Sequence, residues 1–181
     1  MTADAGFTVI ETPRLVLRRF DAADLDAFVA YRADAGVAQF QSWEAGYSRA
    51  QGEQFIDWVT SVHPDTPGEW YQFAIERRAA PGLIGDCAAR FDPAGVEIGF
   101  TLAPAHQRRG YATEAVAALL GYIRSRGHST AVAWCDVENL ASRRVLERLG
   151  FAFDDTVAGE HRFTLDLGIA PSADRQPAGG S

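Results

Sequence analysis

The sequence contains no lysine, and all 17 of its basic residues are arginine. The absence of lysine excludes Schiff-base catalysis, a pyridoxal-binding lysine and the lysine of a Walker A phosphate-binding loop. The two cysteines, Cys87 and Cys135, are far apart and cannot form a disulfide framework. Free thiols are typical of a reducing compartment, so we expect a cytoplasmic protein.

Long apolar runs and metal-binding spacings are also missing. No run of 18 apolar residues occurs, so we expect no membrane span, and residues 1–6 lack the basic and apolar pattern of a secretory signal. The four histidines show no His-x-x-x-His spacing and no Cys-x-x-Cys motif is present, so we expect no metal site. Without a Gly-x-Ser-x-Gly motif, an α/β-hydrolase triad is not expected either.

The length of 181 residues suits one domain, which we place at residues 1–170, followed by a disordered tail at 171–181. The formal net charge is −7, but it is unevenly spread. Residues 107–150 hold seven arginines and four acidic residues, a net charge of +3, which leaves −10 for the rest. An acidic chain binds nucleic acid poorly, so we expect no nucleic-acid partner; the 107–150 segment suits an anion and the remaining surface a cation.

Hydrophobic periodicity and turn signals predict the order of helices and strands. Asp21 and Ser48 are expected to cap the first two helices, and Ser48 with Gln51 forms a capping-box pattern. Residues 33–47 are expected to form a loop. The predicted helices run from Asp21 to about residue 32, from Ser48 through Phe55, Ile56 and Val59, over residues 112–123, and from Asn139 to Gly150. The predicted strands cover residues 14–20, 70–77, 83–91, 96–102, 131–137, 151–153 and 161–167.

The connections between these elements predict a mixed sheet. Short turn-like connectors join the strands at 70–77, 83–91 and 96–102, which indicates an antiparallel meander. A helix then crosses from residues 96–102 to residues 131–137, and such a crossover predicts a parallel pair. That helix carries the clearest apolar stripe of the chain.

Residues 107–113 (QRRGYAT), at the start of this helix, are the best candidate for a ligand site. A helix start exposes unpaired backbone N–H groups and the positive end of the helix dipole. Gly110 and the small Ala112 let a ligand approach the backbone, while Arg108 and Arg109 add positive charge. These features predict a pyrophosphate cradle without lysine; the alternative is a loop that needs glycine to turn and arginine for solubility.

The same segment resembles a known family. QRRGYA fits the Q/R-x-x-G-x-G/A acyl-CoA signature of GNAT-type N-acetyltransferases, and EIGFTLAPAHQRRGYATEAVAALLGY is similar to the RimJ/RimL branch, the bacterial ribosomal-protein N-terminal acetyltransferases. Three other stretches agree, in the right order: TPRLVLRRFDAADLDAF, VAQFQSW before a helix, and NLASRRVLERLGF. The resemblance covers about residues 8–167.

The resemblance implies an α/β (α+β) GNAT acyl-CoA N-acyltransferase fold. In it, about four helices flank a central, twisted, mostly antiparallel sheet, and the parallel strands at 96–102 and 131–137 splay apart at the cofactor cleft. The implied cosubstrate is acetyl-CoA, without a metal. Phe100, Thr101 and Leu102 are implied to pair with the pantetheine arm and to supply an oxyanion donor. The implied pyrophosphate site comprises Gln107, Arg108, Arg109, Gly110, Tyr111, Ala112 and Thr113.

Three further residues are implied to take part in catalysis. Asn139 matches a family position that contacts the CoA arm or a catalytic water, and Ser142 matches a position near the thioester sulfur. Many relatives have a tyrosine acid seven residues after the asparagine, where this chain has Leu146, so it stays open whether an acid is used. Glu97, close to where relatives place a glutamate, is our candidate general base, against the alternative of a solvent-exposed strand residue. Weaker candidates for the base are Glu76, Asp86 and His106.

The predicted activity is transfer of acetyl from acetyl-CoA to a primary amine by direct attack in a ternary complex. The acidic surface favours a cationic acceptor, such as a basic protein N-terminus, a polyamine or an aminoglycoside-like molecule. Two alternatives stay open: a non-catalytic acyl-CoA-binding module, and an enzyme that uses another acyl donor such as succinyl-CoA. Relatives often form dimers, so a homodimer is one expected assembly. An acceptor pocket is one possible role, beside the core, for Phe40, Trp43, Phe55, Trp58, Trp70 and Tyr71.

Overall fold

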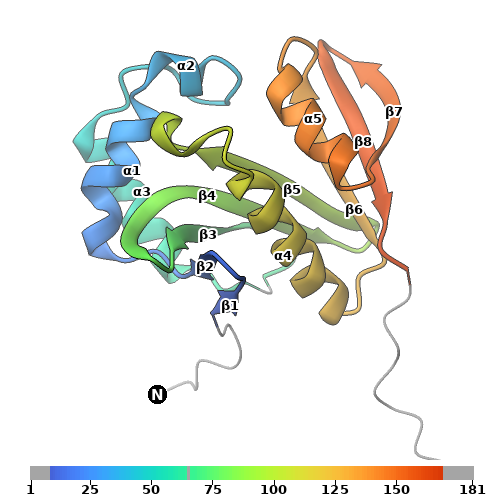
Figure 1. Cartoon of the computed structure of the whole chain (residues 1–181), viewed down its shortest axis with the longest axis horizontal. Coiled ribbons are helices and arrows are strands. Elements are labelled where there is room, and N and C mark those ends of the chain that lie inside the picture. The colour runs from blue at the N-terminus through green and yellow to red at the C-terminus, as the bar shows by residue number, and fades with distance from the viewer. Residues whose placement is uncertain (1–8, 65, 169–181) are drawn as a thin grey trace, which may run out of the picture.

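A computed structural model describes residues 9–64 and 66–168. Its central feature is an eight-stranded sheet with the strand order β1-β2-β3-β4-β5-β6-β8-β7 (Figure 1). The strands are β1 (Ile10–Glu11), β2 (Leu15–Arg18), β3 (Trp70–Arg77), β4 (Ala80–Asp92), β5 (Gly95–Leu102), β6 (Thr130–Asp136), β7 (Ala152–Val157) and β8 (Glu160–Asp166). The α-helices are α1 (Leu25–Arg32), α2 (Ala35–Ala38), α3 (Arg49–Ser61), α4 (Tyr111–Ser125) and α5 (Leu140–Arg148).

All neighbouring strands pair antiparallel except β5 and β6, which are parallel. This confirms the predicted mixed sheet and the position of its parallel pair. The two parallel strands share only three residue pairs, and the last of them joins Ile98 to Ala133. Beyond this point β5 stays paired with β4 and β6 stays paired with β8. The sheet therefore splits along its middle, as the family resemblance implied.

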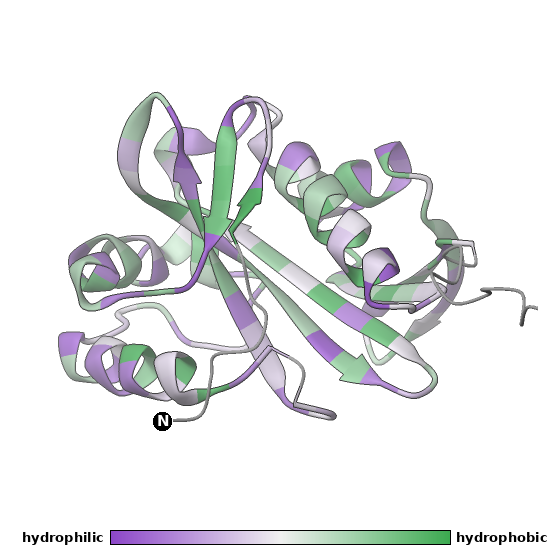
Figure 2. Cartoon of the chain, turned by 90° about the horizontal axis from the view of Figure 1, so that it is seen from below, coloured by the Kyte–Doolittle hydropathy of each residue, from purple (hydrophilic) through white to green (hydrophobic). Residues whose placement is uncertain are grey.

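Helices cover the two faces of the sheet differently. Side chains alternate between the faces of a strand, and the green and purple bands along the strands in Figure 2 follow this alternation. Phe73 of β3 lies in a core cluster with Val116 of α4, whereas its neighbour Ala74 lies in a second cluster with Phe28 of α1 and Ile56 of α3. Helix α4 thus packs on one face and α1 and α3 pack on the other, which positions the start of α4 beside the split.

Two predicted segments differ from the structure near the first helix. Asp21 caps a short 3₁₀ turn, Ala22–Asp24, and α1 follows it. The predicted loop at 33–47 contains α2, whose N-cap Asp34 accepts a hydrogen bond from the backbone N–H of Val37. Helix α2 has only four residues and no apolar period, so periodicity could not reveal it. Strand β1 was missed for the same reason of length.

The strand boundaries also shift. Strand β4 begins before its predicted start at residue 83 and β7 extends to Val157, four residues beyond its prediction. All six residues of β7 are exposed at the edge of the sheet, so no apolar pattern marks its length. Cys87 and Cys135 are free and buried. The predicted tail at 171–181 lies outside the described residues. Within the described part of the chain, no helix is long and apolar enough to cross a membrane.

Candidate active site

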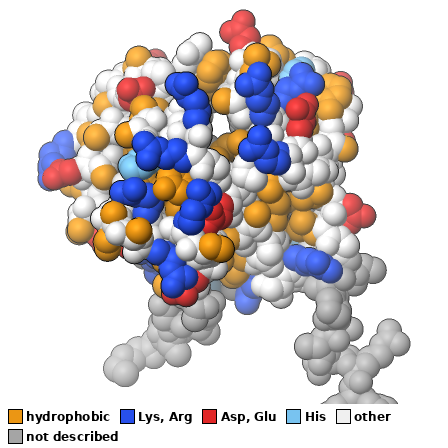
Figure 3. Space-filling view, viewed as in Figure 1, with side chains coloured by type: hydrophobic (Ala, Val, Ile, Leu, Met, Phe, Trp, Pro, Cys, Tyr) orange, Lys and Arg blue, Asp and Glu red, His pale blue; other side chains and the backbone are white. Residues whose placement is uncertain are grey.

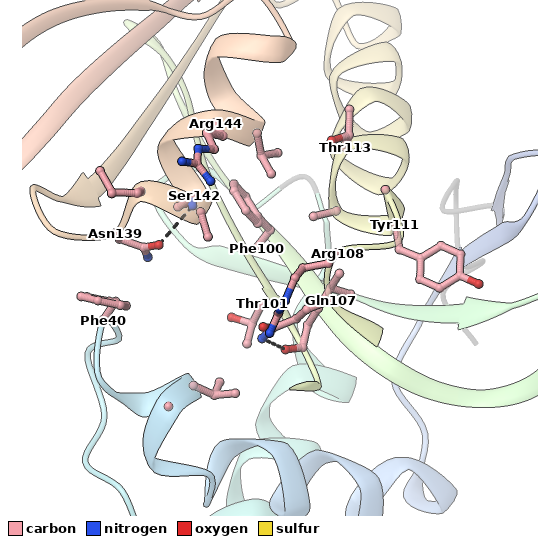
Figure 4. A pocket seen from close by; sticks show the side chains of 18 of the residues that line it. Phe40, Phe100, Thr101, Gln107, Arg108, Tyr111, Thr113, Asn139, Ser142 and Arg144 are labelled. Atoms are coloured by element: carbon pink, nitrogen blue, oxygen red, sulfur yellow. Dashed lines mark hydrogen bonds between the residues drawn. The ribbon is translucent and has the colours of Figure 1, made fainter. Parts of the chain in front are cut away.

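A cavity of about 750 Å³ opens where β5 and β6 separate. It lies among β5, the start of α4, the start of α5 and the segment around α2 (Figure 4). It is lined by Gly36, Val37, Phe40, Gln41, Phe100, Thr101, Leu102, Gln107, Arg108, Gly110, Tyr111, Ala112, Thr113, Glu138, Asn139, Leu140, Ala141, Ser142, Arg144, Val145 and Arg148. The cavity thus collects residues from four segments that are distant in the sequence.

The end of β5 forms one wall of this cavity. Phe100, Thr101 and Leu102, the residues expected to bind the cofactor arm, all line it. This part of β5 pairs with β4 on one side only, because its pairing with β6 stops at Ile98. The side-chain amide of Gln107 donates a hydrogen bond to the carbonyl oxygen of Leu102 (3.0 Å), which ties the following loop to the strand end. An extended ligand can therefore lie along this free strand edge.

The loop before α4 points the start of the helix into the cavity. Gly110, the N-cap residue, has a φ of +79°, a left-handed conformation that glycine adopts without a steric penalty. Arg108 also has a positive φ, +58°, which is uncommon for a residue with a side chain. The unpaired N–H groups of the first helical turn and the positive end of the dipole of this 15-residue helix face an anion placed here.

One predicted member of the pyrophosphate site lies elsewhere. Arg109 does not line the cavity, while the other six residues of the 107–113 segment do. The backbone carbonyl of Arg109 accepts a hydrogen bond from the guanidinium of Arg14 (3.0 Å), which fixes the loop to the start of β2. The sequence could not show this, because the contact joins residues 95 positions apart.

The start of α5 forms the opposite wall. Asn139 caps the helix: its side-chain oxygen accepts a hydrogen bond from the backbone N–H of Ser142 (3.1 Å). The side-chain NH₂ group of Asn139 is then the remaining donor. Asn139 and Ser142, two of the expected catalytic residues, both line the cavity. Leu146 does not; it is fully buried in the core behind the helix.

Glu97, the candidate base, lies outside the cavity lining. It sits on the same strand face as Gly99 and Thr101, and Thr101 does line the cavity. Its carboxylate accepts a hydrogen bond from Arg90 on β4 (2.6 Å), and its side chain is 25% exposed. The strand face above Gly99 is open, since no atom lies within 4 Å of a Cβ placed there.

The three weaker candidates for the base are engaged elsewhere or do not reach the cavity. Glu76 pairs with Arg18 (3.0 Å). Asp86 is buried, accepts a hydrogen bond from the hydroxyl of Tyr31, and has a pKa raised by burial. Burial and the charges of two nearby arginines lower the pKa of His106, which does not line the cavity. None of the three lines the cavity.

Two of the six aromatic residues suggested for an acceptor pocket, Trp43 and Phe55, pack around Arg32. The guanidinium of Arg32 lies 3.8 Å from the ring centre of Trp43 and 4.9 Å from that of Phe55. The indole N–H of Trp43 donates to the backbone carbonyl of Arg32 (3.1 Å). These contacts hold the segment after α2. Of the six suggested residues, Phe40 lines the cavity and the other five do not.

Sequence reasoning missed much of the α5 wall. Arg144 and Arg148, one helical turn apart, line the cavity together with Val145 and Glu138. Arginine side chains border the hollow on both sides in the space-filling view (Figure 3). The spacing of four residues was a signal in the sequence, but this helix also carries Arg143, and only the structure shows which of its arginines face the cavity.

Comparison with known proteins identifies the class of enzyme. The model of the Acetyltransferase (GNAT) domain family matches residues 14–152, well over half of the chain. The protein therefore belongs to the GNAT acetyltransferase family, in the RimJ/RimL-like group that its motifs indicated, and it is an N-acetyltransferase. The family uses acetyl-CoA.

Individual relatives support this assignment. The uncharacterized N-acetyltransferases YoaA and YjdG of Bacillus subtilis (strain 168) are 30% and 42% identical to this chain, over 80% and 79% of it and 83% and 89% of their own lengths. An acetyltransferase of the GNAT family from Bacillus anthracis has the same fold, with a TM-score of 0.78 at 21% identity over 88% of this chain and 99% of its own. RimL in complex with coenzyme A has a TM-score of 0.74 at 20% identity over 88% and 98%.

Proposed function

We propose that this N-acetyltransferase moves acetyl from acetyl-CoA to a primary amine by direct attack in a ternary complex. One observation carries the proposal: the free edge of β5 and the start of α4 open into the same cavity. A pantetheine arm needs an extended backbone partner, and a pyrophosphate needs unpaired N–H groups and positive charge. Both requirements are met along one continuous surface.

In this proposal, the pantetheine arm lies along Phe100, Thr101 and Leu102. The pyrophosphate lies at the start of α4, against the backbone of residues 110–113 with Arg108 beside it. A backbone N–H of β5 then faces the thioester oxygen and stabilises the negative charge that develops there. Asn139 and Ser142 lie across the cavity, where the hydroxyl of Ser142 can donate a hydrogen bond to the sulfur.

The amine nitrogen forms a bond to the acetyl carbonyl carbon, and the carbon–sulfur bond breaks. The nitrogen loses a proton and the departing sulfur gains one, so that the products are an amide and free CoA. A thiol with a pKa of about 8.5 leaves readily as a thiolate. An acid that protonates the departing sulfur is therefore less necessary than a base that takes the proton from the amine. The burial of Leu146 in the core agrees with a mechanism without a tyrosine acid.

Glu97 is the proposed base, acting through a water. Its carboxylate is bonded to Arg90 and lies two residues before Gly99, where the strand face is open. An amine above Gly99 would lie between this carboxylate and the cavity wall at Thr101. Direct contact is not required, because one ordered water can carry the proton between amine and carboxylate.

The acceptor is proposed as a cationic amine or a protein N-terminus. A structural neighbour from Salmonella typhimurium modifies the N-terminal serine of the ribosomal protein L7/L12 (TM-score 0.73, 19% identity, over 88% of this chain and 99% of its own). At that identity the likeness concerns the fold, so the acceptor must be found by experiment. Short peptides with serine and other N-termini belong in the test panel.

The test is release of CoA thiol from acetyl-CoA across such peptides, spermidine and several aminoglycosides, with succinyl-CoA as a second donor. We expect turnover with one class of amine and with acetyl-CoA. Glu97→Gln should lower kcat by about 100-fold or more, the usual contribution of a positioned base, and leave CoA affinity unchanged. Tight CoA binding without transfer to any amine would favour the acyl-CoA-binding module instead.

A further inference from the structure

Arg32, the last residue of α1, is a buried arginine that the proposed reaction does not use. Only 7% of its surface is exposed, although arginine is almost never fully buried without a paired charge. One of its guanidinium nitrogens lies 3.4 Å from the side-chain oxygen of Gln72 and 4.0 Å from a carboxylate oxygen of Asp86. Its Nε is buried without a hydrogen-bond partner in the part of the chain that the structure describes. The charge of Arg32 is therefore only loosely paired.

Aromatic rings surround this guanidinium group. Its central carbon lies 3.8 Å from the ring centre of Trp43, 4.5 Å from that of Phe28, 4.9 Å from that of Phe55 and 5.5 Å from that of Tyr47. A cation is attracted to the face of an aromatic ring, and the attraction is stronger away from water. Arg32 thus joins three parts of the chain: α1 with Phe28, α3 with Phe55, and the chain between these helices with Trp43 and Tyr47.

The chain between α1 and α3 leaves from Arg32 and returns to it. The indole N–H of Trp43 donates a hydrogen bond to the backbone carbonyl of Arg32 (3.1 Å). The backbone N–H of Gly46 donates another to the carbonyl of Ala33 (3.4 Å). We call residues 33–42 the wall segment, because four of its residues line the cavity: Gly36, Val37, Phe40 and Gln41. Arg32 and Trp43 therefore close the two ends of this segment against each other.

The wall segment has little regular structure to hold it in place. Helix α2 has four residues, far fewer than an isolated helix needs to be stable in water. Val37 and Ala38 are buried, whereas Phe40 is only partly buried. Figure 4 shows the side chain of Phe40 on this segment, directed toward the start of α5, where Asn139 lies. The position of Phe40 in the cavity therefore depends on how firmly the ends of the segment are closed.

We propose that Arg32 is a positioning residue for the acetyl transfer: through Trp43 and the wall segment, it holds Phe40 beside the reacting end of the ligand. The inference rests on the proposed function, in which Asn139 and Ser142 mark that end across the cavity. Arg32 itself does not line the cavity. A shift of about 1 Å in a group that positions the substrate can lower the rate about 100-fold, so a loosened wall segment has a large effect on transfer.

The test is a double-mutant cycle in the full chain, with an amine that the panel above shows to be an acceptor. Arg32→Met removes the charge but keeps a long apolar side chain, and Phe40→Ala removes the ring that is positioned. Each single variant should lower kcat/KM for the amine by about 10- to 100-fold. The double variant should fall no further than the worse single variant, because the second change removes an interaction already lost.

Two further variants complete the cycle. Arg49→Met is the control, because Arg49 on α3 is 62% exposed and pairs with Asp26 and Glu53; it should keep wild-type kinetics. If Arg32→Met does not fold, Trp43→Phe takes its place, since it removes the indole N–H that closes the segment. It should show the same non-additivity with Phe40→Ala.

Hydrogen exchange measures the hold of Arg32 on the wall segment without an acceptor. In Arg32→Met, the backbone amides of Ala38, Gln39 and Gln41, each hydrogen-bonded within the segment, should exchange at least about 10-fold faster. Amides in the middle of α3 should keep wild-type rates. Equally faster exchange in α3 would show a general loss of stability and contradict the positioning role.

The kinetic outcomes separate the two proposals. Wild-type kinetics in Arg32→Met, or additive losses in the double variant, would overturn the positioning role and leave the proposed function intact. If the wild-type protein transfers acetyl to no amine, the proposed function itself fails and the positioning role fails with it.

Discussion

Glu114 in the first turn of α4 joins the functional helix to the start of β2. Its carboxylate accepts hydrogen bonds from the hydroxyl of Thr12 (2.6 Å), the backbone N–H of Arg14 (2.9 Å) and the guanidinium of Arg14 (2.6 Å). Burial alone would raise the pKa of Glu114, but these hydrogen bonds outweigh it and lower the pKa below the ordinary value of 4.5. The interactions therefore need the ionised carboxylate.

This arrangement predicts a pH-dependent loss of stability in Glu114→Gln. A carboxyl with a lowered pKa in the folded state contributes stability above its unfolded pKa, and this contribution disappears as pH falls through the folded value. At pH 7 we expect the free energy of unfolding to drop by about 1–3 kcal/mol, the range for hydrogen bonds to a charged group. As pH falls through the lowered pKa of Glu114 in the folded state, the variant and the wild type should converge. Urea unfolding at several pH values measures both.

Glu147 offers the matched control for that experiment. It also pairs with an arginine, Arg143, but both side chains are nearly half exposed. Such surface pairs contribute little, so Glu147→Gln should change the free energy of unfolding by less than about 0.5 kcal/mol at any pH. An equal loss in both variants, or a loss in Glu114→Gln that persists at low pH, would mean that the carboxylate charge is not the cause.

At the level of elements, the sequence predicted what local patterns determine. The apolar stripe of α4 and the capping box of Ser48 and Gln51 both appear where expected, because each depends on residues within a few positions. The short elements α2 and β1 were missed, since four residues and two residues carry no periodicity. Strand β7 was too short in the prediction because its outward-facing edge needs no apolar pattern.

The residues of the candidate site also fall into two groups, those that a local sequence motif reveals and those that only the packing of distant elements brings together. Residues inside contiguous motifs, such as Gly110 and Asn139, were found from the sequence and line the cavity. Arg109 belongs to the same motif as Gly110, yet its side of the loop faces away from the cavity. The walls formed by Phe40 and Arg148 depend on how α2 and α5 pack beside β5, and no local pattern encodes that.

The open strand face at Gly99 predicts a defect in acceptor binding. Gly99 does not line the cavity, needs no unusual backbone angle, and would have no neighbouring atom within 4 Å of an added Cβ. Gly99→Leu should therefore fold and bind CoA normally, but fill the space between Glu97 and Thr101. We expect kcat/KM for the amine to fall by about 10- to 100-fold through a displaced acceptor, with the Kd for CoA unchanged. Steady-state kinetics and calorimetry measure the two.

Gly121→Leu is the control for the effect of adding a leucine side chain at a glycine outside the cavity. Gly121 also has open space around it and an ordinary backbone angle, but it lies in the middle of α4, outside the cavity lining. Its replacement should leave both kinetics and CoA binding unchanged. If Gly99→Leu keeps full activity toward the amine, the acceptor does not lie on this strand face, and the role of Glu97 loses its main support.

At the scale of the whole molecule, the cavity lies along the line where β5 and β6 meet, which we call the seam. Strands β5 and β6 share only three residue pairs, whereas β4 with β5 and β6 with β8 pair along eight and seven residues. The cavity residues are divided between these two halves: those up to Thr113 belong to one, and those from Glu138 onward to the other. A ligand that contacts both walls must therefore tie the halves together.

This division predicts where CoA stabilises the protein. At a concentration of 100 times Kd, a ligand that binds only the folded state adds about 2.7 kcal/mol. For a chain of this size that corresponds to a rise in Tm of roughly 5–10 °C. Beyond this global effect, hydrogen exchange should slow most at the free edge of β5 and in α5, because local opening of the seam separates these two elements. Strands β1 to β3, which do not line the cavity, provide the internal reference for global stabilisation. Protection confined to residues 107–113, with α5 unchanged relative to that reference, would show that one half alone holds CoA and that the seam opens independently of the ligand.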